Sequence, residues 1–430
     1  MSRPGPELVA AAAPEPRREP SPAITPGSLK ALVGLLVLTM GTSILTPLLP
    51  LYKSHFELST GTATLLFVTY TVTVCPTMLI AGNLADRLGR KHLLLPAMAI
   101  MTVASLVFAL AESVPLLFVG RVLQGLAIGG FLGVGAAFVV DHAHRERKAL
   151  AAALAGVFFR LGFGLGPGLG GIVAEYAASP RHTPFWGHIA LMVVGIVAVS
   201  TAGETLLRRE GRGRFRIRIG VPQGQALGFL TYIAPATFMM SFVEGTVLSV
   251  VPIFVAEELG VGNLAVIGAI GFLVLGLGAV APFLARGMDP RNAVALGAGV
   301  SSLISFLVVL SAAADTVWLV VAAAAAIGTI NGFILYGGTV ICGTIVPLEE
   351  RGKLMSLLYM CAYAGTVPTV GLGYLADAIG LTETLAIFSG AAVVIAAFVL
   401  VVGRRLFLEV VPFREVPEPG EAAAKAIASA

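Results

Sequence analysis

Residues 81–95 read AGNLADRLGRKHLLL, a cluster of charge that lies between two long apolar runs. Its charged side chains, apart from a histidine, are Asp86, Arg87, Arg90 and Lys91. Only 12% of the whole chain is charged, so this concentration needs a physical reason. Gly82 lets two helix ends approach closely, and Gly89 permits a tight turn because a positive φ costs glycine little. The stretch therefore predicts a short polar turn between two apolar helices.

The composition places these helices in a membrane. Hydrophobic residues make up 57% of the 430 residues, and the mean hydropathy is +0.92, which is typical of a polytopic membrane protein. One spanning helix needs roughly 20 apolar residues. We therefore expect an all-α fold. Its twelve predicted spans are 31–52, 59–83, 93–111, 115–140, 149–176, 185–207, 225–255, 263–285, 293–313, 316–345, 354–376 and 383–403.

The distribution of Lys and Arg predicts how these spans are oriented. Nearly all of these residues fall on the side of the two tails, whereas the loops of the other side carry only Lys53 and Arg181. Positive loops stay in the cytoplasm. We expect a multi-pass protein of the cell (cytoplasmic or inner) membrane, with both termini cytoplasmic. The formal net charge of +4 then reflects topology and contact with the lipid bilayer, and indicates no nucleic-acid partner.

A basic linker at residues 208–224 divides the chain into two halves. Residues 31–207 and 225–403 each hold six predicted spans. The proline-rich residues 1–30 predict a disordered cytoplasmic tail, and residues 404–430 a second cytoplasmic tail. The halves resemble each other weakly, with NLADRLGRK falling opposite FLARGMDPR. This repeat indicates two pseudo-symmetric six-helix bundles with a substrate path between them.

The charged turn resembles the G-x-L-A-D-R-x-G-R-K loop signature of the major facilitator superfamily. The matching residues are Gly82, Leu84, Ala85, Asp86, Arg87, Gly89, Arg90 and Lys91. The resemblance implies the major facilitator fold and a cytoplasmic latch, in which the Asp meets the start of a second-half helix. It also implies that an arginine of the loop pairs with an acid ending the fourth span, here Asp141. A plain positive-inside turn would explain the Arg and Lys residues, but not the Asp or both glycines.

A second motif lies in the fourth predicted span. Arg121, Gln124 and Gly125 share one helix face, because they follow one another at i, i+3 and i+4. They resemble the R-x-x-Q-G motif of drug–proton antiporters in the superfamily, and the resemblance implies a role for Arg121 in proton coupling. Alternatively, Arg121 snorkels to the outer surface, since it lies only about two turns inside the membrane edge.

Two further charged residues are predicted deep in the membrane, where charge is costly and usually functional. Arg160 in the fifth span needs an acidic, amide or aromatic partner, and it could restrain a carboxylate or bind an anionic substrate group. Glu244 in the seventh span could load and release a proton, because low dielectric favours a neutral carboxyl group. A static ion pair is the alternative. The first span has no acid, so coupling rests on Glu244, or on Asp141 with Arg121.

The fifth span also carries the run GFGLGPGLGG. Gly162, Gly166 and Gly170 recur every four residues and form a smooth face for close helix packing. Pro167 removes a helical hydrogen bond and bends the helix, and Gly171 widens the groove. The run resembles the G-x-x-x-G-P-x-x-G-G signature of antiporters in the superfamily, which implies packing against the eighth span and prevention of leak. Glycine packing without a transport role is the alternative.

Aromatic and weakly polar side chains of the predicted cavity suit lipophilic substrates. The candidates are Thr46, Tyr70, Phe131, Phe159, Phe238, Asn331, Tyr336 and Tyr363. Few charges accompany them, which argues against sugar phosphates or dicarboxylates. The acids Glu175, Glu204 and Asp377 lie at the ends of spans, where we expect interfacial positions. The three cysteines lack metal-ligand spacing, so we expect no metal site.

As a set, these motifs are most similar to those of the twelve-span drug–proton antiporters. We expect a monomeric transporter that exports lipophilic small molecules in exchange for protons by alternating access, with the proton gradient as energy source and no cofactor. A transporter dedicated to one metabolite, exporting or importing it, is an alternative, as is a non-transporting membrane sensor on the same scaffold. An enzyme is not expected, because no nucleotide loop, metal cluster or Ser–His–Asp set stands in a supporting context.

Overall fold

The structure is a computed structural model that describes residues 24–205, 225–346 and 348–410. Every regular element in these residues is helical, and twelve helices are long and apolar enough to cross a membrane. This confirms the predicted all-α fold and its twelve spans. The predicted basic linker and most of both predicted tails lie outside the described residues. The surroundings of Gly82 and of the Asp86 side chain are likewise not described.

The first half contains spans one to six. Its elements are α1 (Pro26–Ser43), η1 (Thr46–Leu48), α2 (Leu49–His55), α3 (Thr60–Leu88), α4 (Arg90–Ala109), α5 (Val114–Asp141), η2 (Arg145–Arg147), α6 (Lys148–Tyr176) and α7 (Thr183–Ser200). Span one is interrupted, because α1 ends at Ser43 and the 3₁₀ turn η1 separates it from α2. This interruption places polar side chains and freed carbonyl groups in the middle of the first half.

The second half contains spans seven to twelve, and several of them change helix type. Its elements are α8 (Ala226–Gly228), η3 (Phe229–Ile233), α9 (Ala234–Ser249), α10 (Val251–Glu257), α11 (Leu264–Gly276), η4 (Leu277–Val280), α12 (Ala281–Leu284), α13 (Pro290–Ile304), α14 (Phe306–Ala313), α15 (Val317–Thr344), α16 (Leu348–Thr366), α17 (Pro368–Ile379), α18 (Leu381–Phe398), η5 (Val399–Gly403) and α19 (Arg404–Val410). Elements η3 and η5 are π-helical turns, and η4 is a 3₁₀ turn. Each predicted span overlaps one helix or a short series of them, but α7 ends at Ser200, before the predicted end of the sixth span at residue 207.

The start of span one differs from the prediction. Helix α1 begins at Pro26, where proline suits the first helical turn. The Thr25 side chain caps it, because Thr25 Oγ1 accepts a hydrogen bond from Ser28 N at 3.0 Å. Residues 26–30 are therefore helical and do not belong to a disordered tail.

The end of the last span also differs from the prediction. Helix α19 continues span twelve to Val410, so the tail predicted at residues 404–430 does not begin at residue 404. Phe407 explains the extension, because its ring is buried and lies 5.2 Å from the ring of Tyr232. An aromatic contact of this kind stabilises the helical turn that carries it.

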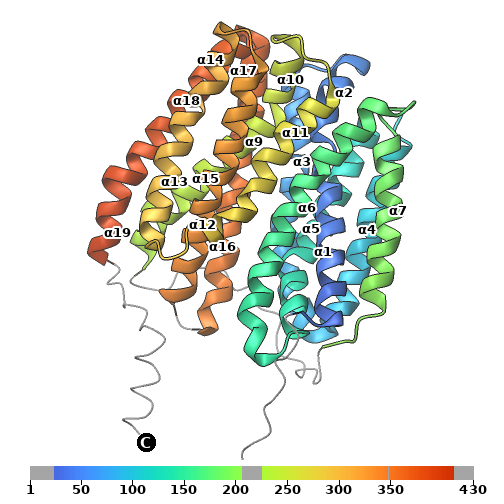
Figure 1. Ribbon diagram of the computed structural model, residues 1–430, viewed down its shortest axis with the longest axis vertical. Helices are drawn as coiled ribbons and strands as arrows, with labels where there is room; N and C mark the ends of the chain where they lie inside the picture. The colour runs from blue at the N-terminus through green and yellow to red at the C-terminus, as the bar shows by residue number, and fades with distance from the viewer. Residues whose placement is uncertain (1–23, 206–224, 347, 411–430) are drawn as a thin grey trace, which may run out of the picture.

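The two halves form two helix bundles that lie side by side (Figure 1). One end of the molecule carries the start of α1, Arg90 and Lys148, and we call it the basic end. The other end carries Lys53 and Arg181, and we call it the opposite end. The bundles converge at the opposite end, where α2 contacts α10 and α3 contacts α17, and they diverge toward the basic end (Figure 1).

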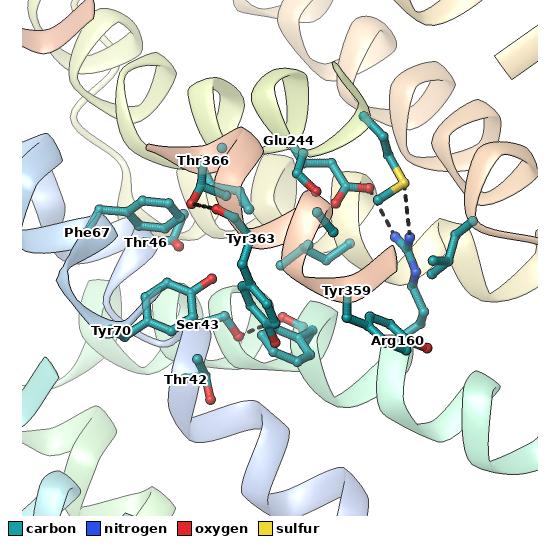
Figure 2. A pocket seen from close by; sticks show the side chains of 18 of the residues that line it. Thr42, Ser43, Thr46, Phe67, Tyr70, Arg160, Glu244, Tyr359, Tyr363 and Thr366 are labelled. Carbon is teal, nitrogen blue, oxygen red and sulfur yellow. Dashed lines mark hydrogen bonds and ion pairs between the residues drawn. The ribbon is translucent and has the colours of Figure 1, made fainter. Parts of the chain in front are cut away.

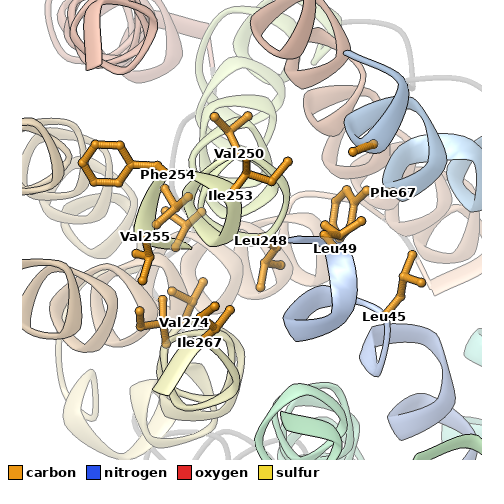
Figure 3. Close-up of a cluster of buried hydrophobic side chains, with 14 of the residues drawn as sticks. Leu45, Leu49, Phe67, Leu248, Val250, Ile253, Phe254, Val255, Ile267 and Val274 are labelled. Atoms are coloured by element: carbon orange, nitrogen blue, oxygen red, sulfur yellow. The ribbon is translucent and has the colours of Figure 1, made fainter. Parts of the chain in front are cut away.

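A cluster of buried hydrophobic side chains joins the two halves at the opposite end (Figure 3). It includes Leu45 and Leu49 of span one and Phe67 of span two from the first half. Leu248 and Ile253 of span seven belong to the same cluster and come from the second half. Two other large clusters draw their buried members from one half each. Packing between the halves is therefore concentrated at the opposite end.

Glycines bring the fifth and eighth spans, α6 and α11, into contact. A Cβ added at Gly171 would lie 2.9 Å from the Cα of Gly268, and one added at Gly164 would lie 2.7 Å from the Cα of Gly276. The backbones approach so closely that neither position accepts a side chain without a shift. This contact agrees with the packing that the resemblance to antiporters implies.

The predicted glycine face of the fifth span has a different neighbour. Added Cβ atoms at Gly162, Gly166 and Gly170 would meet atoms of span one, in α1 or in the turn that follows it. This face therefore allows close packing, as predicted, but it does so inside the first half. Gly164 and Gly171 lie on a different face of the same helix and make the contact with the second half.

Replacing Gly268 by Ala should destabilise the protein, because the added methyl group would collide with the carbonyl oxygen of Pro167. Overpacking of this kind costs about 1–3 kcal/mol. We expect a lower Tm for Gly268→Ala in thermal unfolding of the purified protein in detergent. Gly187→Ala is the matched control in another helix, since no described atom lies within 4 Å of its Cβ position. Equal Tm values for both variants would contradict the contact.

Candidate functional site

A pocket lies between the two halves, near the middle of the spans (Figure 2). Its cavity volume is about 110 Å³. The first half contributes side chains from α1, η1, α3 and α6, and the second half from α9, α11, α15 and α16. Most of the wall is aromatic or apolar. The charged residues of the wall, Arg160 and Glu244, lie together on one side of it (Figure 2).

Arg160 and Glu244 form an ion pair that joins the two halves. Arg160 Nη1 lies 3.1 Å from Glu244 Oε1, and the exposed fractions of the side chains are 9% and 12%. Helix α6 positions the arginine, and α9 positions the acid (Figure 2). The structure thus gives Arg160 the acidic partner that its depth in the membrane demands. Because each half supplies one partner, the pair breaks if α6 and α9 move apart.

Four of the predicted cavity residues line this pocket: Thr46, Tyr70, Phe159 and Tyr363. The rings of Tyr70 and Tyr363 meet across the two halves with their centroids 6.3 Å apart. They form part of the aromatic wall that faces the ion pair. A lipophilic ring could therefore contact both halves at once.

The other four predicted cavity residues, Phe131, Phe238, Asn331 and Tyr336, do not line the pocket. Phe131 is buried in the core of the first half. Phe238 lines a separate groove between spans seven, eleven and twelve. Asn331 Nδ2 donates to the carbonyl oxygen of Met240 at 3.3 Å, and Tyr336 packs beside a small core cluster of the second half. The prediction was wrong for these residues because spacing identifies a helix face but not the neighbour that covers it.

Arg121 is fully buried inside the first half and does not snorkel to the surface. Its guanidinium group donates hydrogen bonds to the backbone oxygens of Thr42, Leu66 and Phe67 and to Gln124 Oε1, at 2.7–3.0 Å. Its charge is thus surrounded by neutral acceptors from spans one and two. Among the described residues, no acid forms an ion pair with Arg121.

The other residues of this motif complete the same arrangement. Gln124 Nε2 donates to the carbonyl oxygen of Gly41 at 2.7 Å. Gly125 lies against the backbone of Tyr70, where a Cβ atom would collide. Because Gly41 lies in the last turn of α1, its carbonyl group lacks a regular helical donor. The motif of Arg121, Gln124 and Gly125 therefore binds the end of α1 to spans two and four.

The charged turn after span two is anchored within the first half. Arg90 Nη1 lies 3.0 Å from Asp141 Oδ2, as the loop signature implies for the acid at the end of span four. Lys91 Nζ donates to the carbonyl oxygen of Ala202 at 2.9 Å. Gly89 has a φ of +99°, which confirms its role as the turn residue. These contacts hold the turn against spans four and six.

The four residues predicted to couple protons do not form one site. Only Arg160 and Glu244 line the pocket. Arg121 and Asp141 lie twenty residues apart on α5, which separates them by about 30 Å at 1.5 Å per residue. Asp141 also accepts a hydrogen bond from Thr205 Oγ1 at 3.0 Å, at the basic end. The structure therefore does not support a coupling pair of Asp141 with Arg121.

A second cavity, of about 440 Å³, lies between the pocket and the basic end. Ala85 and Arg90 line it from the first half, and Ser356 from the second. Phe159 and Tyr359 line both cavities and separate them. The space between the halves therefore extends from the ion pair to the level of the charged turn.

Two acids close the opposite end by accepting hydrogen bonds from helix N-termini of the other half. Glu175 Oε2, near the end of α6, accepts from Leu264 N at the start of α11 at 2.7 Å. The Asp377 carboxylate, near the end of α17, accepts from Thr60 N at 2.8 Å and Gly61 N at 2.9 Å, at the start of α3. The positive end of each helix dipole favours this placement. These span-end acids therefore join the halves, which their expected interfacial positions did not indicate.

The two caps are related by the internal repeat. Span five of the first half corresponds to span eleven of the second, and span two corresponds to span eight. Glu175 on span five caps span eight, and Asp377 on span eleven caps span two. Lys53 Nζ adds an ion pair with Glu257 Oε1 at 2.6 Å between the same halves. Polar contacts between the halves thus close the opposite end, in addition to the hydrophobic cluster that joins the halves there.

Ser43 has a role that the sequence did not indicate. Pro167 has no N–H group, so the carbonyl oxygen of Phe163, one turn earlier, lacks its helical donor. Ser43 Oγ donates to this oxygen at 2.7 Å (Figure 2). A proline inside a membrane helix was the available signal, but the sequence does not say which neighbour supplies the donor.

The family model of the Major Facilitator Superfamily matches residues 31–229 and 233–429. The chain therefore belongs to the Major Facilitator Superfamily, a family of membrane transporters. It is a multi-pass membrane protein, and the resemblance noted in the charged turn is confirmed.

Similar proteins include bacterial resistance proteins. The chain is 24% identical to Multidrug resistance protein 2 of Bacillus subtilis (strain 168) over 179 residues, which cover 42% of this chain and 44% of the relative. It is 24% identical to Quinolone resistance protein NorA of Staphylococcus aureus (strain Mu50 / ATCC 700699) over 163 residues, or 38% of this chain and 41% of the relative. The chain thus spans less than half the length of both relatives.

Solved structures with a similar fold cover most of the chain. The crystal structure of the peptide transporter POT in complex with sulfate matches with a TM-score of 0.75 and 14% identity, over 90% of this chain and 96% of that one. A bacterial homologue of the human lysosomal transporter Spinster matches with a TM-score of 0.69 and 15% identity, over 92% and 100%. These similarities support the fold described above.

Removing both caps should loosen the opposite end. Asp377→Ala with Glu175→Ala deletes the acceptors for the N-termini of α3 and α11. Each cap is worth about 1 kcal/mol, which is roughly a fivefold change in an equilibrium. Spin labels at Ser54 and Glu258, both exposed at this end, report the distance between spans one and seven. We expect electron–electron double resonance to show a larger population of long distances.

Asp289→Ala provides the matched control for this experiment. Asp289 also caps a helix, because its Oδ1 accepts from Arg291 N at 2.8 Å, but it does so within the second half and at the basic end. The Asp289→Ala variant with the same two spin labels should show the same distance distribution as the parent protein. If the double variant also keeps the parent distribution, the two caps do not hold the halves together.

Proposed function

We propose that this protein exports lipophilic small molecules in exchange for protons by alternating access. The observation that carries the proposal is the ion pair of Arg160 and Glu244, which joins the halves inside a mostly apolar pocket. A carboxylate in this position can exchange its contact with the arginine for a proton. Because the contact depends on how close α6 and α9 lie, protonation and movement of the halves are linked.

The similar proteins and the pocket wall support the substrate class. Multidrug resistance protein 2 and Quinolone resistance protein NorA are resistance proteins by name, and each matches part of this chain. The aromatic side chains Phe67, Tyr70, Phe159 and Tyr363 provide a wall that suits lipophilic compounds. The broad substrate range of a multidrug exporter and a narrower one are both compatible with such a wall.

We place the basic end in the cytoplasm of the cell (inner) membrane, with both termini cytoplasmic, because Lys and Arg collect at that end. In this orientation the cavity of about 440 Å³ faces the cytoplasm. The caps of Glu175 and Asp377 then close the external side. The described conformation corresponds to an inward-facing state of the cycle.

The cycle follows from these positions. In the inward-facing state, Glu244 gives up its proton to the cytoplasm and pairs with Arg160, and a substrate enters the pocket through the cytoplasmic cavity. The halves then rock, so that the caps at the opposite end release and the cytoplasmic cavity closes. The substrate leaves to the outside, Glu244 takes up a proton there, and the protonated form returns.

One chain supplies the whole pocket, so we propose that the monomer is the working unit. The proton gradient provides the energy, and the cycle uses no cofactor and no chemical reaction of an enzyme. Small-molecule substrate and protons are therefore the partners of the protein, within the lipid bilayer. The loop signature is kept and anchored by the pair of Arg90 and Asp141, which favours a moving transporter over a sensor on the same scaffold.

Replacing Glu244 by Gln should abolish proton-driven transport. Gln cannot release a proton or pair with the charge of Arg160, so an imposed pH gradient should no longer drive accumulation in proteoliposomes. A lipophilic substrate, found by screening neutral and cationic compounds against the parent protein, should still exchange down its own gradient. We expect loss of gradient-driven accumulation by at least tenfold, with substrate counterflow retained.

Glu257→Gln is the matched control, because Glu257 also pairs with a cation of the other half but lies 45% exposed at the opposite end. It should keep the response to the pH gradient. Transport by Glu244→Gln that still follows the pH gradient would contradict the coupling role. Absence of any solute movement by the parent, across the whole panel, would contradict the proposed function itself.

A further inference from the structure

Two buried hydroxyl groups in the pocket lack hydrogen-bond partners. Thr42 is 3% exposed and Thr46 is 1% exposed, and both line the pocket. Neither Oγ1 atom has a partner. Leaving a buried hydroxyl unpaired is unfavourable, and most buried polar groups in proteins are paired. The two residues flank the interruption of span one, on the side of the pocket across from Arg160 and Glu244 (Figure 2).

Other buried threonines of this chain satisfy their hydroxyl groups locally. Thr39 Oγ1 donates to the carbonyl oxygen of Leu35 at 2.9 Å, and Thr246 Oγ1 donates to that of Phe242 at 2.8 Å. Both oxygens lie one helical turn earlier on the same helix. This is the usual solution for a hydroxyl in a membrane helix. Thr42, in the last turn of α1, departs from it although its helix offers the same kind of acceptor.

The backbone around these threonines is already bound to other groups. The carbonyl oxygen of Thr42 accepts from Arg121 Nη1 at 2.9 Å. Ser43, the next residue, donates its hydroxyl to the carbonyl oxygen of Phe163 at 2.7 Å. Two neighbouring segments thus hold the interruption of span one in place. The hydroxyl groups of Thr42 and Thr46 are left without a partner, and both residues line the pocket, where a bound molecule can supply one.

The charges of the pocket limit what that molecule can be. Arg160 and Glu244 already neutralise each other at 3.1 Å. A cation bound to Glu244 would leave the arginine unpaired, and an anion bound to Arg160 would leave the carboxylate unpaired. In a buried site either outcome carries a large penalty. An uncharged molecule leaves the pair intact while Glu244 is ionised, which is the form that takes up substrate in the proposed cycle.

We propose that Thr42 and Thr46 form a hydrogen-bonding subsite for an uncharged lipophilic substrate. The substrate carries an amide, carbonyl or hydroxyl group that pairs with the two threonines, and a ring that packs on the aromatic wall of Phe67, Tyr70 and Tyr363. This inference rests on the proposed function, since it names the class of compound that the same pocket exports. The proposal predicts that the pocket binds such uncharged compounds more tightly than permanent lipophilic cations.

The test measures equilibrium binding of two probes to the purified protein at neutral pH. Chloramphenicol is uncharged and carries an aromatic ring, an amide and hydroxyl groups, whereas tetraphenylphosphonium is a lipophilic cation without a hydrogen-bonding group. We expect the parent to bind chloramphenicol more tightly. Thr42→Val and Thr46→Val keep the shape of the side chain and remove the hydroxyl, so each should weaken chloramphenicol binding about two- to tenfold. Their effect on tetraphenylphosphonium should be small.

Thr246→Val is the matched control, because it removes a buried hydroxyl that bonds within its own helix and does not line the pocket. It should leave the affinity for chloramphenicol unchanged, and thermal unfolding should show that all three variants are folded. Unchanged chloramphenicol affinity in folded Thr42→Val and Thr46→Val would overturn the subsite. Tighter binding of tetraphenylphosphonium, or no chloramphenicol binding at millimolar concentration, would overturn it as well.

The binding experiment uses no gradient, so its failure can be told apart from failure of the proposed function. Chloramphenicol binding that depends on Thr42 and Thr46 supports the subsite even if an imposed pH gradient drives no transport. Conversely, gradient-driven transport by the parent together with chloramphenicol binding that is unchanged in Thr42→Val and Thr46→Val would support proton exchange and overturn the subsite.

Discussion

Every polar backbone group inside the membrane needs a partner from the protein itself, because the hydrocarbon core of the bilayer offers none. Span one is interrupted where α1 ends, and Pro167 removes one backbone donor inside the continuous helix α6, so carbonyl groups are freed at both places. Arg121 and Gln124 bind those of span one, and the Ser43 hydroxyl binds the one that Pro167 releases. These freed carbonyl groups in the irregular middle of the first half therefore have partners, and the pocket lies beside them.

The same constraint separates the roles of the two buried arginines. Arg121 is bound on all sides by neutral oxygens of one half, so movement of the halves leaves its partners in place. Arg160 meets a carboxylate of the other half, so its partner changes when the halves move. A charge that keeps its partners stabilises a bundle, whereas in the proposed cycle a charge pair shared between the two halves links their positions to protonation. Depth in the membrane alone would not distinguish these two side chains.

Much of the fold could be predicted from the sequence, because membrane helices are specified by apolar length and the turn by its own residues. The pair of Arg90 and Asp141 follows from the loop signature. The depth of Arg160 predicted that it needs an acidic, amide or aromatic partner, but the sequence did not identify Glu244 as that partner. The neighbours of each helix face could not be predicted in the same way. Spacing defined the face of Gly162 and its repeats, but not that span one would cover it. Apart from Gln124, the hydrogen-bond partners of Arg121 are backbone oxygens, which no side-chain pattern reveals.

The symmetric placement of Glu175 and Asp377 has a consequence for how the opposite end would open. The two caps are individually weak, but the rigid bundles connect them, so they act as a bivalent clasp. When one cap breaks, the other cap keeps the separated acid and helix N-terminus close together, at a high effective concentration. The broken cap therefore re-forms quickly. Loss of a single acid is therefore buffered, and the clasp yields only when both helix ends are released in the same event. Such a clasp would make opening an all-or-none step and keep partly open, leaky intermediates rare.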